Sequence, residues 1–353
     1  MTAGPLRRLL AAATGRPCHA HYDPAKPHHT PAGFRNTSGL PPPRSSDVLR
    51  WQWQRLRARR PRPPAAPIGS VAPANADLRA ANSATWLGHA TLLARLGDCT
   101  VLTDPQFGRY ASPLPFAGPP RHQPPPVRLG DLPRVDVVAL SHSHYDHLDR
   151  ATVRALYRQP GEPPRFLAPL GVDDWLARHV CNGERDRIHA LDWWQTTYIG
   201  ALRATLLPVQ HWSARTLWDR NATLWGAWAL EAGGVRFFFA GDLGLSPDVD
   251  AIGAACGGFD LAALPIGAYA PRWIMQPYHL DPAEAVAVHQ RIGARRSVAV
   301  HWGTFEGLTD EPLDEPPQRL VAARAAAGLA PEAFQVIRPG ETVYAAGRDT
   351  AGA

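Results

Sequence analysis

One short segment restricts what this chain can be more than any other feature of its sequence. Directly after the apolar run VDVVAL come four side chains of metal-ligand type within six residues, namely His142, His144, Asp146 and His147. Alternate side chains of an extended segment point to the same side, so the first three are predicted to share a face, with His147 at the following turn. Imidazole and carboxylate groups together suit Zn²⁺ and similar metals. A solvated polar turn does not need so many ionisable groups, so the segment predicts a metal site.

Three later apolar runs each end in one further residue of metal-ligand type. His211 follows ATLLPVQ, Asp242 follows VRFFFAG and His301 follows SVAV. We interpret these runs as strands, and clefts in layered α/β folds form at the carboxyl ends of strands. Any one of these residues alone is more often structural, but together with the first segment they supply enough ligands for two zinc ions per chain. The predicted assignment is His142, His144 and His211 to one ion, Asp146, His147 and His301 to the other, and Asp242 to both.

From residue 81 onward, short apolar runs alternate with polar turns. Residues 84–96 and 99–104 are predicted as two strands joined by the Gly97-Asp98 turn. Further strands are predicted at residues 135–140, 165–169, 201–210, 224–232, 235–242, 260–269 and 297–305, and helices at residues 149–158, 171–180, 282–292 and 317–329. This pattern predicts one mixed α/β domain with two sheets over residues 81–353, preceded by a proline- and arginine-rich segment over residues 1–80.

The N-terminal segment contains proline runs that exclude regular helix and central strand, on either side of one helix-forming stretch. That stretch, SSDVLRWQWQRLRARR, places Leu49, Trp53 and Leu56 on one helical face. Ser46 or Asp47 is predicted to cap the helix. Two interpretations stay open. A basic amphipathic helix with tryptophans is typical of an anionic membrane surface, and the alternative is a helix strapped onto the main domain.

Charge and cysteine content limit the partners and the cellular compartment that we expect for the protein. The formal net charge of +6 comes almost wholly from arginine, since Lys26 is the only lysine. Arginine suits phosphate, but without a lysine-rich patch or an RNA-binding module no nucleic-acid partner is expected. The four cysteines form no CxxC pair, so a reducing, cytoplasmic compartment is expected. No run of about 18 apolar residues occurs, so membrane contact should be peripheral. A homodimer is compatible with the sequence.

The ligand pattern and the segments around it resemble a known family. The HxHxDH run and the later single ligands look like the metallo-β-lactamase superfamily, and more narrowly the chain resembles the N-acyl-phosphatidylethanolamine-hydrolysing phospholipases D. The matching segments between Thr85 and Phe305 are TWLGHATLL, LTDPQF, SHSHYDHLD, ALDWW, QHWSARTLWDRN, LWGAW, FFFAGD, FDLAALPIGAYAPRW and HWGTF, with GFRN and VLRW further upstream. The resemblance implies a four-layer αβ/βα sandwich with two zinc ions. It also implies hydrolysis of N-acyl-phosphatidylethanolamine to N-acylethanolamine and phosphatidate, with the phospholipid met at a membrane surface.

Several residues outside the ligand set have expected roles, and for Asp104 the role is suggested by the resemblance. Asp104, at the end of LTD, is expected to orient a ligand histidine, the alternative being a turn-forming aspartate before proline. His279 is expected to touch the phosphate or the amide of a substrate. Arg215 is a candidate phosphate contact, with a surface salt bridge as the alternative. Tyr278 is placed among the substrate contacts too, although the family is expected to carry a polar amide there, which leaves headgroup and acyl selectivity open. His89 is explained equally well as a packed histidine or as a neighbour of the cleft.

In the predicted reaction, Asp146, His147 and Asp242 are the catalytic members of the ligand set. Two metal ions lower the pKa of a water between them to about 7, so that it can attack phosphorus without a protein nucleophile. The absence of a GxSxG motif agrees with this chemistry. The alternatives are another hydrolase of the same fold, such as a lactonase or a nuclease-type phosphodiesterase, or a non-catalytic lipid-binding protein. A flavin-linked di-iron enzyme is disfavoured, because a glutamate would be expected at His144.

Overall fold

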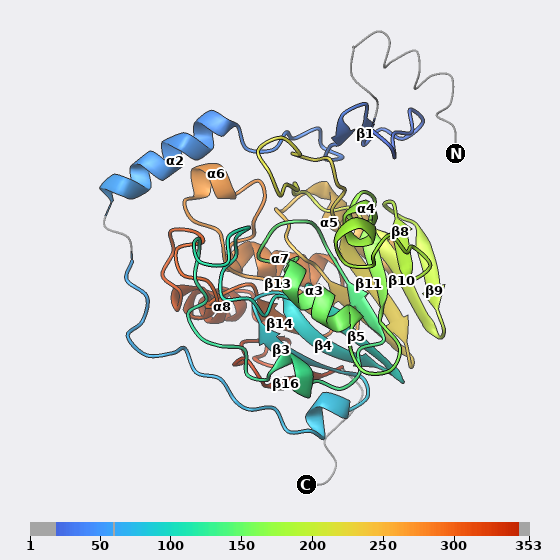
Figure 1. The fold of residues 1–353 in the computed structure, drawn as a ribbon. Helices are drawn as coiled ribbons and strands as arrows, with labels where there is room; N and C mark the ends of the chain where they lie inside the picture. The colour runs from blue at the N-terminus through green and yellow to red at the C-terminus, as the bar shows by residue number, and fades with distance from the viewer. Residues whose placement is uncertain (1–18, 59–60, 346–353) are drawn as a thin grey trace.

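The computed structural model describes residues 19–58 and 61–345, and two seven-stranded sheets form its centre (Figure 1). In spatial order the first sheet consists of β16 (Thr342–Tyr344), β3 (Ser83–Gly88), β4 (Thr91–Leu96), β5 (Cys99–Thr103), β6 (Val137–Ala139), β7 (Arg165–Pro169) and β8 (Ile188–Leu191). The second consists of β15 (Phe334–Gln335), β14 (Ser297–Val300), β13 (Leu261–Pro265), β12 (Val235–Phe239), β11 (Ala227–Ala232), β10 (Leu202–Leu207) and β9 (Thr196–Ile199).

The two sheets are built alike. In the first sheet the neighbours from β16 to β5 pair antiparallel and those from β5 to β8 pair parallel. In the second sheet the neighbours from β9 to β12 pair antiparallel and those from β12 to β15 pair parallel. Parallel neighbours end at the same edge, so each sheet delivers the loops after its parallel strands to one side of the molecule.

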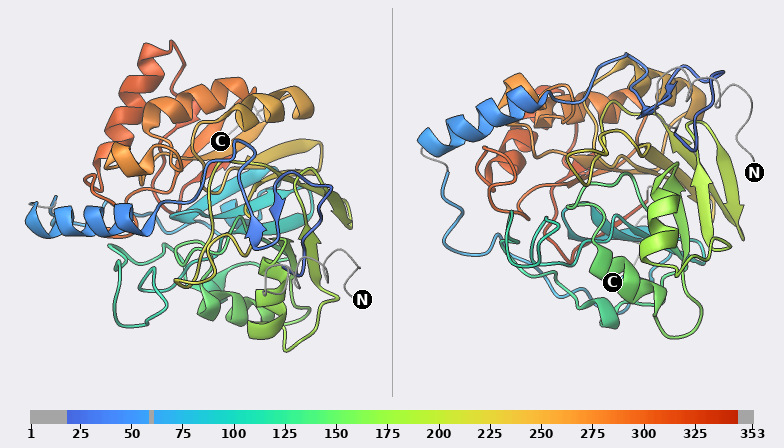
Figure 2. Two further views of the ribbon diagram at one scale, coloured as in Figure 1. Left: turned by 90° about the horizontal axis from the view of Figure 1, so that it is seen from above. Right: turned by 45° about the horizontal axis from the view of Figure 1, so that its top comes forward.

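Helices lie outside both sheets, which gives the molecule four layers. In the left view of Figure 2, α3 (Arg150–Tyr157) and α4 (Val172–His179) lie on one side of the sheets, and the orange and red helices lie on the other. These are α5 (Pro247–Cys256), α6 (Arg272–Met275), α7 (Pro282–Arg291) and α8 (Glu315–Ala326), and two short 3-10 helices, η1 (Asp77–Arg79) and η2 (Leu129–Asp131), lie in connecting loops. The predicted αβ/βα sandwich is confirmed.

The main core contains side chains of both sheets. Trp86 of β3, Trp228 of β11 and Phe237 and Phe239 of β12 are all at most 1% exposed and belong to one apolar cluster. Strands that are covered on both faces need apolar residues at consecutive positions rather than at alternate ones. This explains why VRFFF and LAALP are apolar almost throughout. Burial of each such side chain contributes about 1.5–3 kcal/mol. The Trp228 indole also donates to the carbonyl of Leu140 at 2.8 Å and so ties β11 to the backbone just ahead of the HxHxDH segment.

Two of the local predictions are wrong. Residues 84–96 form two strands, β3 and β4, because the chain turns between them at Gly88 and His89, where φ is 109° and 52°. Apolar residues continue through this turn, so hydrophobicity alone does not show the break. The second error concerns the cap of α2 (Ser45–Arg57), whose N-cap is Arg44 with no side-chain cap, rather than Ser46 or Asp47.

The described part of the N-terminal segment packs on the domain. It forms a small hairpin of β1 (His29–Thr30) and β2 (Gly33–Phe34), followed by α2. One face of α2 contacts α6 through Trp51, whose indole donates to the Asp310 carboxylate at 2.7 Å. On the rest of the helix, Leu49, Trp53 and Leu56 are 69%, 52% and 80% exposed. The helix is therefore strapped to the domain and still presents apolar side chains to solvent.

Two further features concern the predicted surroundings of the protein. Cys99, Cys181 and Cys256 carry free thiols, whereas Cys18 lies outside the described residues. Among the helices within residues 19–58 and 61–345, none has the length and apolar character needed to cross a membrane.

Candidate metal centre

The predicted ligands meet where strands of both sheets end. Residues 142–147 follow β6 of the first sheet, and His211, Asp242 and His301 follow β10, β12 and β14 of the second. The last three are at most 3% exposed. His301 has a φ of 61° and Asp104, which follows β5, has a φ of 30°. This left-handed backbone is uncommon for residues other than glycine and is maintained where the surrounding structure imposes it, often at functional sites.

The first group of donors is His142, His144, His211 and Asp242, whose ligand atoms all lie within 4.8 Å of one another. His144 Nδ1 is 2.8 Å from His142 Nε2 and 3.4 Å from His211 Nε2. Asp242 Oδ2 is 3.9 Å from His142 Nε2 and 3.8 Å from His211 Nε2. These are the members predicted for one ion, with the shared carboxylate included.

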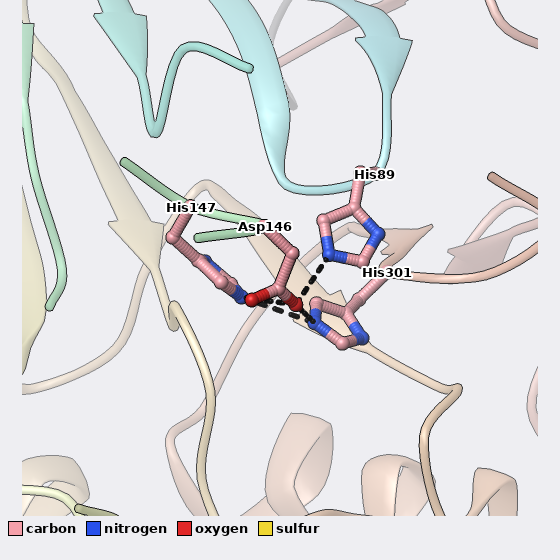
Figure 3. A group of neighbouring side chains, drawn as sticks. All are labelled: His89, Asp146, His147 and His301. Atoms are coloured by element: carbon pink, nitrogen blue, oxygen red, sulfur yellow. Dashed lines mark hydrogen bonds and ion pairs between the residues drawn. The ribbon is translucent and has the colours of Figure 1, made fainter. Parts of the chain in front are cut away.

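The second group is His89, Asp146, His147 and His301, which Figure 3 shows converging around the Asp146 carboxylate. His147 Nε2 and His301 Nε2 are 3.1 Å apart, and each is 3.4 Å from Asp146 Oδ2. Three of its members are those predicted for the other ion. His89 is the additional member.

Asp242 lies between the two groups. One carboxylate oxygen, Oδ2, is 3.2 Å from His147 Nε2, and the other, Oδ1, is 3.1 Å from His301 Nε2. The same Oδ2 faces the histidines of the first group at slightly longer range. This is the position that the sequence predicts for the shared ligand.

The donor set fits a pair of divalent metal ions. Ligands held 2.0–2.2 Å from a tetrahedral zinc ion lie about 3.3 Å from one another, close to the observed separations of 2.8 to 3.9 Å. Two facing ring nitrogens, such as those of His147 and His301, share at most one proton, and a cation satisfies both lone pairs. Two buried ring nitrogens, His144 Nε2 and His279 Nδ1, have no hydrogen-bond partner among the described residues, and buried polar atoms normally have one.

The pKa shifts of the centre follow from burial and from its two carboxylates. Burial holds the pKa values of His142 and His211 well below the ordinary value, so both rings are neutral, the form that binds metals. Burial alone would raise the pKa of Asp242, but the nearby His147 and His301 lower it well below its usual range. Burial alone would likewise lower the pKa of His147, and the carboxylates of Asp242 and Asp146 raise it well above its usual range.

Asp104 lies in the contact predicted for it. Its Oδ2 is 2.6 Å from His147 Nδ1, which leaves Nε2 of that ring directed into the centre. The same carboxylate accepts hydrogen bonds from the backbone N–H and the hydroxyl of Ser141 at 2.7 and 2.5 Å. The Ser141 hydroxyl is in turn 2.8 Å from His142 Nδ1. One buried carboxylate thus orients a histidine of each donor group, as partners of metal-binding histidines commonly do.

The three residues predicted to contact substrate lie in different surroundings. His279 Nδ1 is 3.8 Å from Asp242 Oδ2, so its ring borders the centre. The Tyr278 side chain is directed to the N-terminal segment, where its hydroxyl donates to the carbonyl of Pro41 at 2.5 Å, while its own carbonyl is 3.0 Å from His211 Nδ1. Arg215 donates to the carbonyls of Ser143 and Leu148, so its described contacts hold the ligand segment. Direct substrate contact by Tyr278 and Arg215 remains a prediction.

Two residues of the site were missed or left open by sequence reasoning. His89 Nε2 is 2.9 Å from Asp146 Oδ2, and its ring centroid is 3.9 Å from that of His301. Its position in the turn after an apolar strand is the same signal that marks the other ligands. Asn36 is 1% exposed, and its Oδ1 accepts the backbone N–H of His211 at 3.0 Å. The two residues are 175 positions apart, so no local pattern could have paired them.

Comparisons with known proteins agree with the fold and the site. The profile described as the beta-lactamase superfamily domain matches residues 100–302. A metallo hydrolase from Ignicoccus hospitalis has a similar structure, with a TM-score of 0.53 and 21% identity over 74% of this chain and 97% of the other.

Two relatives carry a more specific name. N-acyl-phosphatidylethanolamine-hydrolyzing phospholipase D 1 of Caenorhabditis elegans is 41% identical over 67% of this chain and 68% of its own. The mitochondrial N-acyl-phosphatidylethanolamine-hydrolyzing phospholipase D of Saccharomyces cerevisiae is 31% identical over 67% of this chain and 50% of its own.

The fold and the donor set together define a metal-dependent hydrolase of the metallo-β-lactamase superfamily. Within that superfamily, the chain belongs to the family of the N-acyl-phosphatidylethanolamine-hydrolysing phospholipases D.

Proposed function

We propose that this protein is a zinc phosphodiesterase of the phospholipase D type, which hydrolyses N-acyl-phosphatidylethanolamine to N-acylethanolamine and phosphatidate. The observation that carries the proposal is the pair of donor groups joined by Asp242, in which every ligand is present. The names of the two relatives support the lipid substrate. Ligands of mixed imidazole and carboxylate type favour zinc.

The reaction needs no covalent intermediate with the protein. An oxygen–phosphorus bond forms from water, the bond from phosphorus to the ethanolamine oxygen breaks, and the leaving oxygen takes up a proton. Bound divalent ions make water acidic enough to attack near neutral pH and neutralise the charge that develops on phosphoryl oxygens. His142, His144 and His211 would hold one ion, and Asp146, His147 and His301, with His89 in reach, would hold the other.

His279 is the side chain best placed to contact the phosphate. Burial lowers the pKa of its ring to about 4, so the imidazole is neutral near pH 7 and can donate a hydrogen bond from one nitrogen. Its Nδ1 is buried without a partner at the edge of the centre. A phosphoryl oxygen or the leaving oxygen of the substrate would give that nitrogen its missing hydrogen bond.

A phospholipid substrate has to be met at a membrane surface, and α2 offers a face for this. Leu49, Trp53 and Leu56 are exposed on it, and the Arg57 guanidinium lies 3.6 Å from the centroid of the Trp53 ring. Tryptophan favours the headgroup level and arginine is attracted to anionic lipid. The variant Trp53→Ala with Leu56→Ala should reduce vesicle binding roughly tenfold, since two exposed apolar side chains are lost. Trp51→Ala is the matched control, because Trp51 is buried against the domain and its loss should lower stability instead.

The function is tested by incubating the zinc-loaded protein with a mixed phospholipid extract and following products by lipid mass spectrometry. We expect N-acylethanolamine and phosphatidate to appear together and in equal amounts, and neither to appear with Asp242→Asn protein. Release of a free fatty acid, or of a diacylglycerol in place of phosphatidate, would contradict the proposed position of cleavage. Cleavage of a soluble phosphodiester without any N-acylethanolamine from the extract would retain the hydrolase and reject the lipid substrate.

A further inference from the structure

A groove with a volume of about 800 Å³ borders residues 142–147, the segment that carries four of the predicted metal ligands. It is lined by α3 and α4, by the loop of residues 108–115 and by residues 215–219. The two helices lie next to each other in green in Figures 1 and 2. Tyr145, which stands between two metal ligands in the sequence, contributes to its wall. The groove is thus a separate concavity that shares one segment with the candidate metal centre.

The lining of the groove is strongly basic. It contains five arginines and two aspartates. Both aspartates are occupied by backbone groups, since Asp149 accepts the N–H groups at the start of α3 and Asp219 accepts those of residues 215 and 216. Arg150, Arg154 and Arg178 make no ion pair or hydrogen bond with any residue in the described ranges 19–58 and 61–345.

Unpaired arginines that line one groove favour the binding of an anion. Burial lowers the pKa of His179, and the charges of Arg150, Arg178 and Arg215, which line the same groove, lower it further. Planar guanidinium groups bind the oxygens of a phosphate in pairs. A phosphate monoester, with up to two negative charges, would offset the mutual repulsion of these arginines.

The rim of the groove favours a lipid as the source of that phosphate. Leu114 lines the groove and is 47% exposed, and Phe116, two residues further along the same loop, is 73% exposed. On the facing loop, Leu217 and Trp218 are 80% and 88% exposed. Large apolar side chains on loops around a polar cavity are costly in water and are typical of an interaction surface. A soluble phosphate ester would leave them in water, whereas a bilayer would take them up.

We infer that this groove is a second lipid site, which binds the phosphate monoester headgroup of an acidic phospholipid through Arg150, Arg154 and Arg178 while the rim enters the headgroup layer. The site is distinct from the metal centre and does not depend on which bond that centre cleaves. It positions the protein on an acidic membrane patch with the metal centre beside the bilayer.

The test compares two double variants that remove the same charge. Arg150→Gln with Arg178→Gln changes the groove, and Arg79→Gln with Arg295→Gln changes two exposed arginines that do not line it. Binding is measured by sedimentation with phosphatidylcholine vesicles that contain phosphatidate, and with vesicles of equal surface charge that contain phosphatidylserine. No turnover is involved, so failure of the proposed function leaves the result readable. A titration with glycerol 3-phosphate tests the soluble source of the same phosphate.

We expect the groove variant to bind phosphatidate vesicles roughly 10- to 30-fold more weakly, as the loss of two membrane-facing arginines should give, and the control variant less than about threefold more weakly. The loss should be smaller on phosphatidylserine vesicles, and hydrolysis of a soluble phosphodiester should be unchanged. Equal losses in both variants would overturn the site, because general charge attraction would then explain binding. Glycerol 3-phosphate binding that disappears in the groove variant, with vesicle binding intact, would overturn the lipid source in favour of a soluble phosphate.

Discussion

Two of the clusters of histidine and aspartate within residues 19–58 and 61–345 can be compared, and the first, the candidate metal centre, has features of a metal site that the second lacks. The second is the Asp192 clamp, formed by Lys26, His28, His29 and Asp192, which fixes the N-terminal hairpin to the domain. Asp192 Oδ1 is 2.7 Å from His28 Nε2, and Oδ2 is 2.9 Å from His29 Nε2 and 2.5 Å from Lys26 Nζ. Its carboxylate is 1% exposed, close to the 2% of Asp242 in the metal centre.

The difference lies in what each imidazole faces. In the clamp, both rings face a single carboxylate, and the Lys26 ammonium supplies the cation from within the chain. In the metal centre, ring nitrogens face one another, and no lysine or arginine forms an ion pair with Asp146 or Asp242 among the described residues. A cluster whose charge and hydrogen bonds are balanced by its own side chains is a structural joint, whereas ring nitrogens that face one another present lone pairs that a bound cation would satisfy.

The largest expected effect separates the two clusters by activity. Asp146→Asn and Asp242→Asn should each lower turnover of a soluble phosphodiester by at least about a thousandfold, because each removes a charged ligand from the centre. Asp192→Asn should leave turnover within a few-fold at temperatures where the protein is folded. Circular dichroism of each variant verifies folding. If Asp192→Asn is as inactive as Asp242→Asn while folded, the distinction between joint and centre is wrong.

Metal content tests the same distinction directly. Elemental analysis of zinc-loaded protein should give about two equivalents per chain, in accord with two donor groups that share one carboxylate. Removal of the metal with a chelator should abolish activity and lower the melting temperature, and zinc should restore both. The pair His28→Ala with His29→Ala should keep the full metal content. A third equivalent that disappears in this pair would mean that the clamp also binds metal.

Asp104→Asn should have an intermediate effect. The amide oxygen can still accept the backbone N–H of Ser141, but the amide nitrogen cannot accept from the Ser141 hydroxyl or from His147, and the charge that orients His147 is lost. Partners of this kind typically change metal affinity 10- to 100-fold when they are removed. Titration with a competing chelator measures that affinity, and activity at saturating zinc should largely recover. Unchanged affinity would reduce Asp104 to a turn-forming residue, the alternative considered from the sequence.

The metal centre could be predicted from the sequence because its signals are local. Each ligand directly follows an apolar run, so the strand, its end and the ligand are read from one short segment, as with SVAV and His301. His89 escaped assignment because the turn that carries it is hidden inside an apolar stretch. α5 was not predicted either, since its ten residues include three alanines and a glycine and give little apolar periodicity.

The Asp192 clamp could not be predicted by such reasoning. Lys26, His28 and His29 lie 163 to 166 positions before Asp192 in the sequence. The segment around the two histidines has neither a strand pattern nor a helical one. The contact between Asn36 and His211 has the same character. The fold therefore follows from local apolar patterns, whereas the way in which the N-terminal segment supports the site depends on tertiary packing that those patterns do not describe.

The smallest effect on activity, and the clearest on stability, is expected for the clamp. Burial alone would raise the pKa of Asp192, but hydrogen bonds from His28 and Lys26 outweigh it and hold that pKa well below its usual range. A carboxyl group with a lowered pKa stabilises the fold at any pH above its unfolded value of about 3.9 and loses that contribution as the pH falls below it. Asp192→Asn should therefore lower the free energy of unfolding by about 3 kcal/mol at pH 7, the cost of breaking a buried pair.

The pH dependence of this loss of stability tests whether Asp192 acts through its charge. The difference in unfolding free energy between the two proteins should stay constant between about pH 5 and 7 and shrink below about pH 4, because only the wild-type group can take up a proton there. Urea unfolding at several pH values measures it, with Asp98→Asn, at a carboxylate fully exposed to solvent, as a matched change that should have little effect. A difference that persists unchanged at pH 3 would show that Asp192 acts through packing rather than through its charge, and the clamp would then differ from the metal centre in more than the source of its cation.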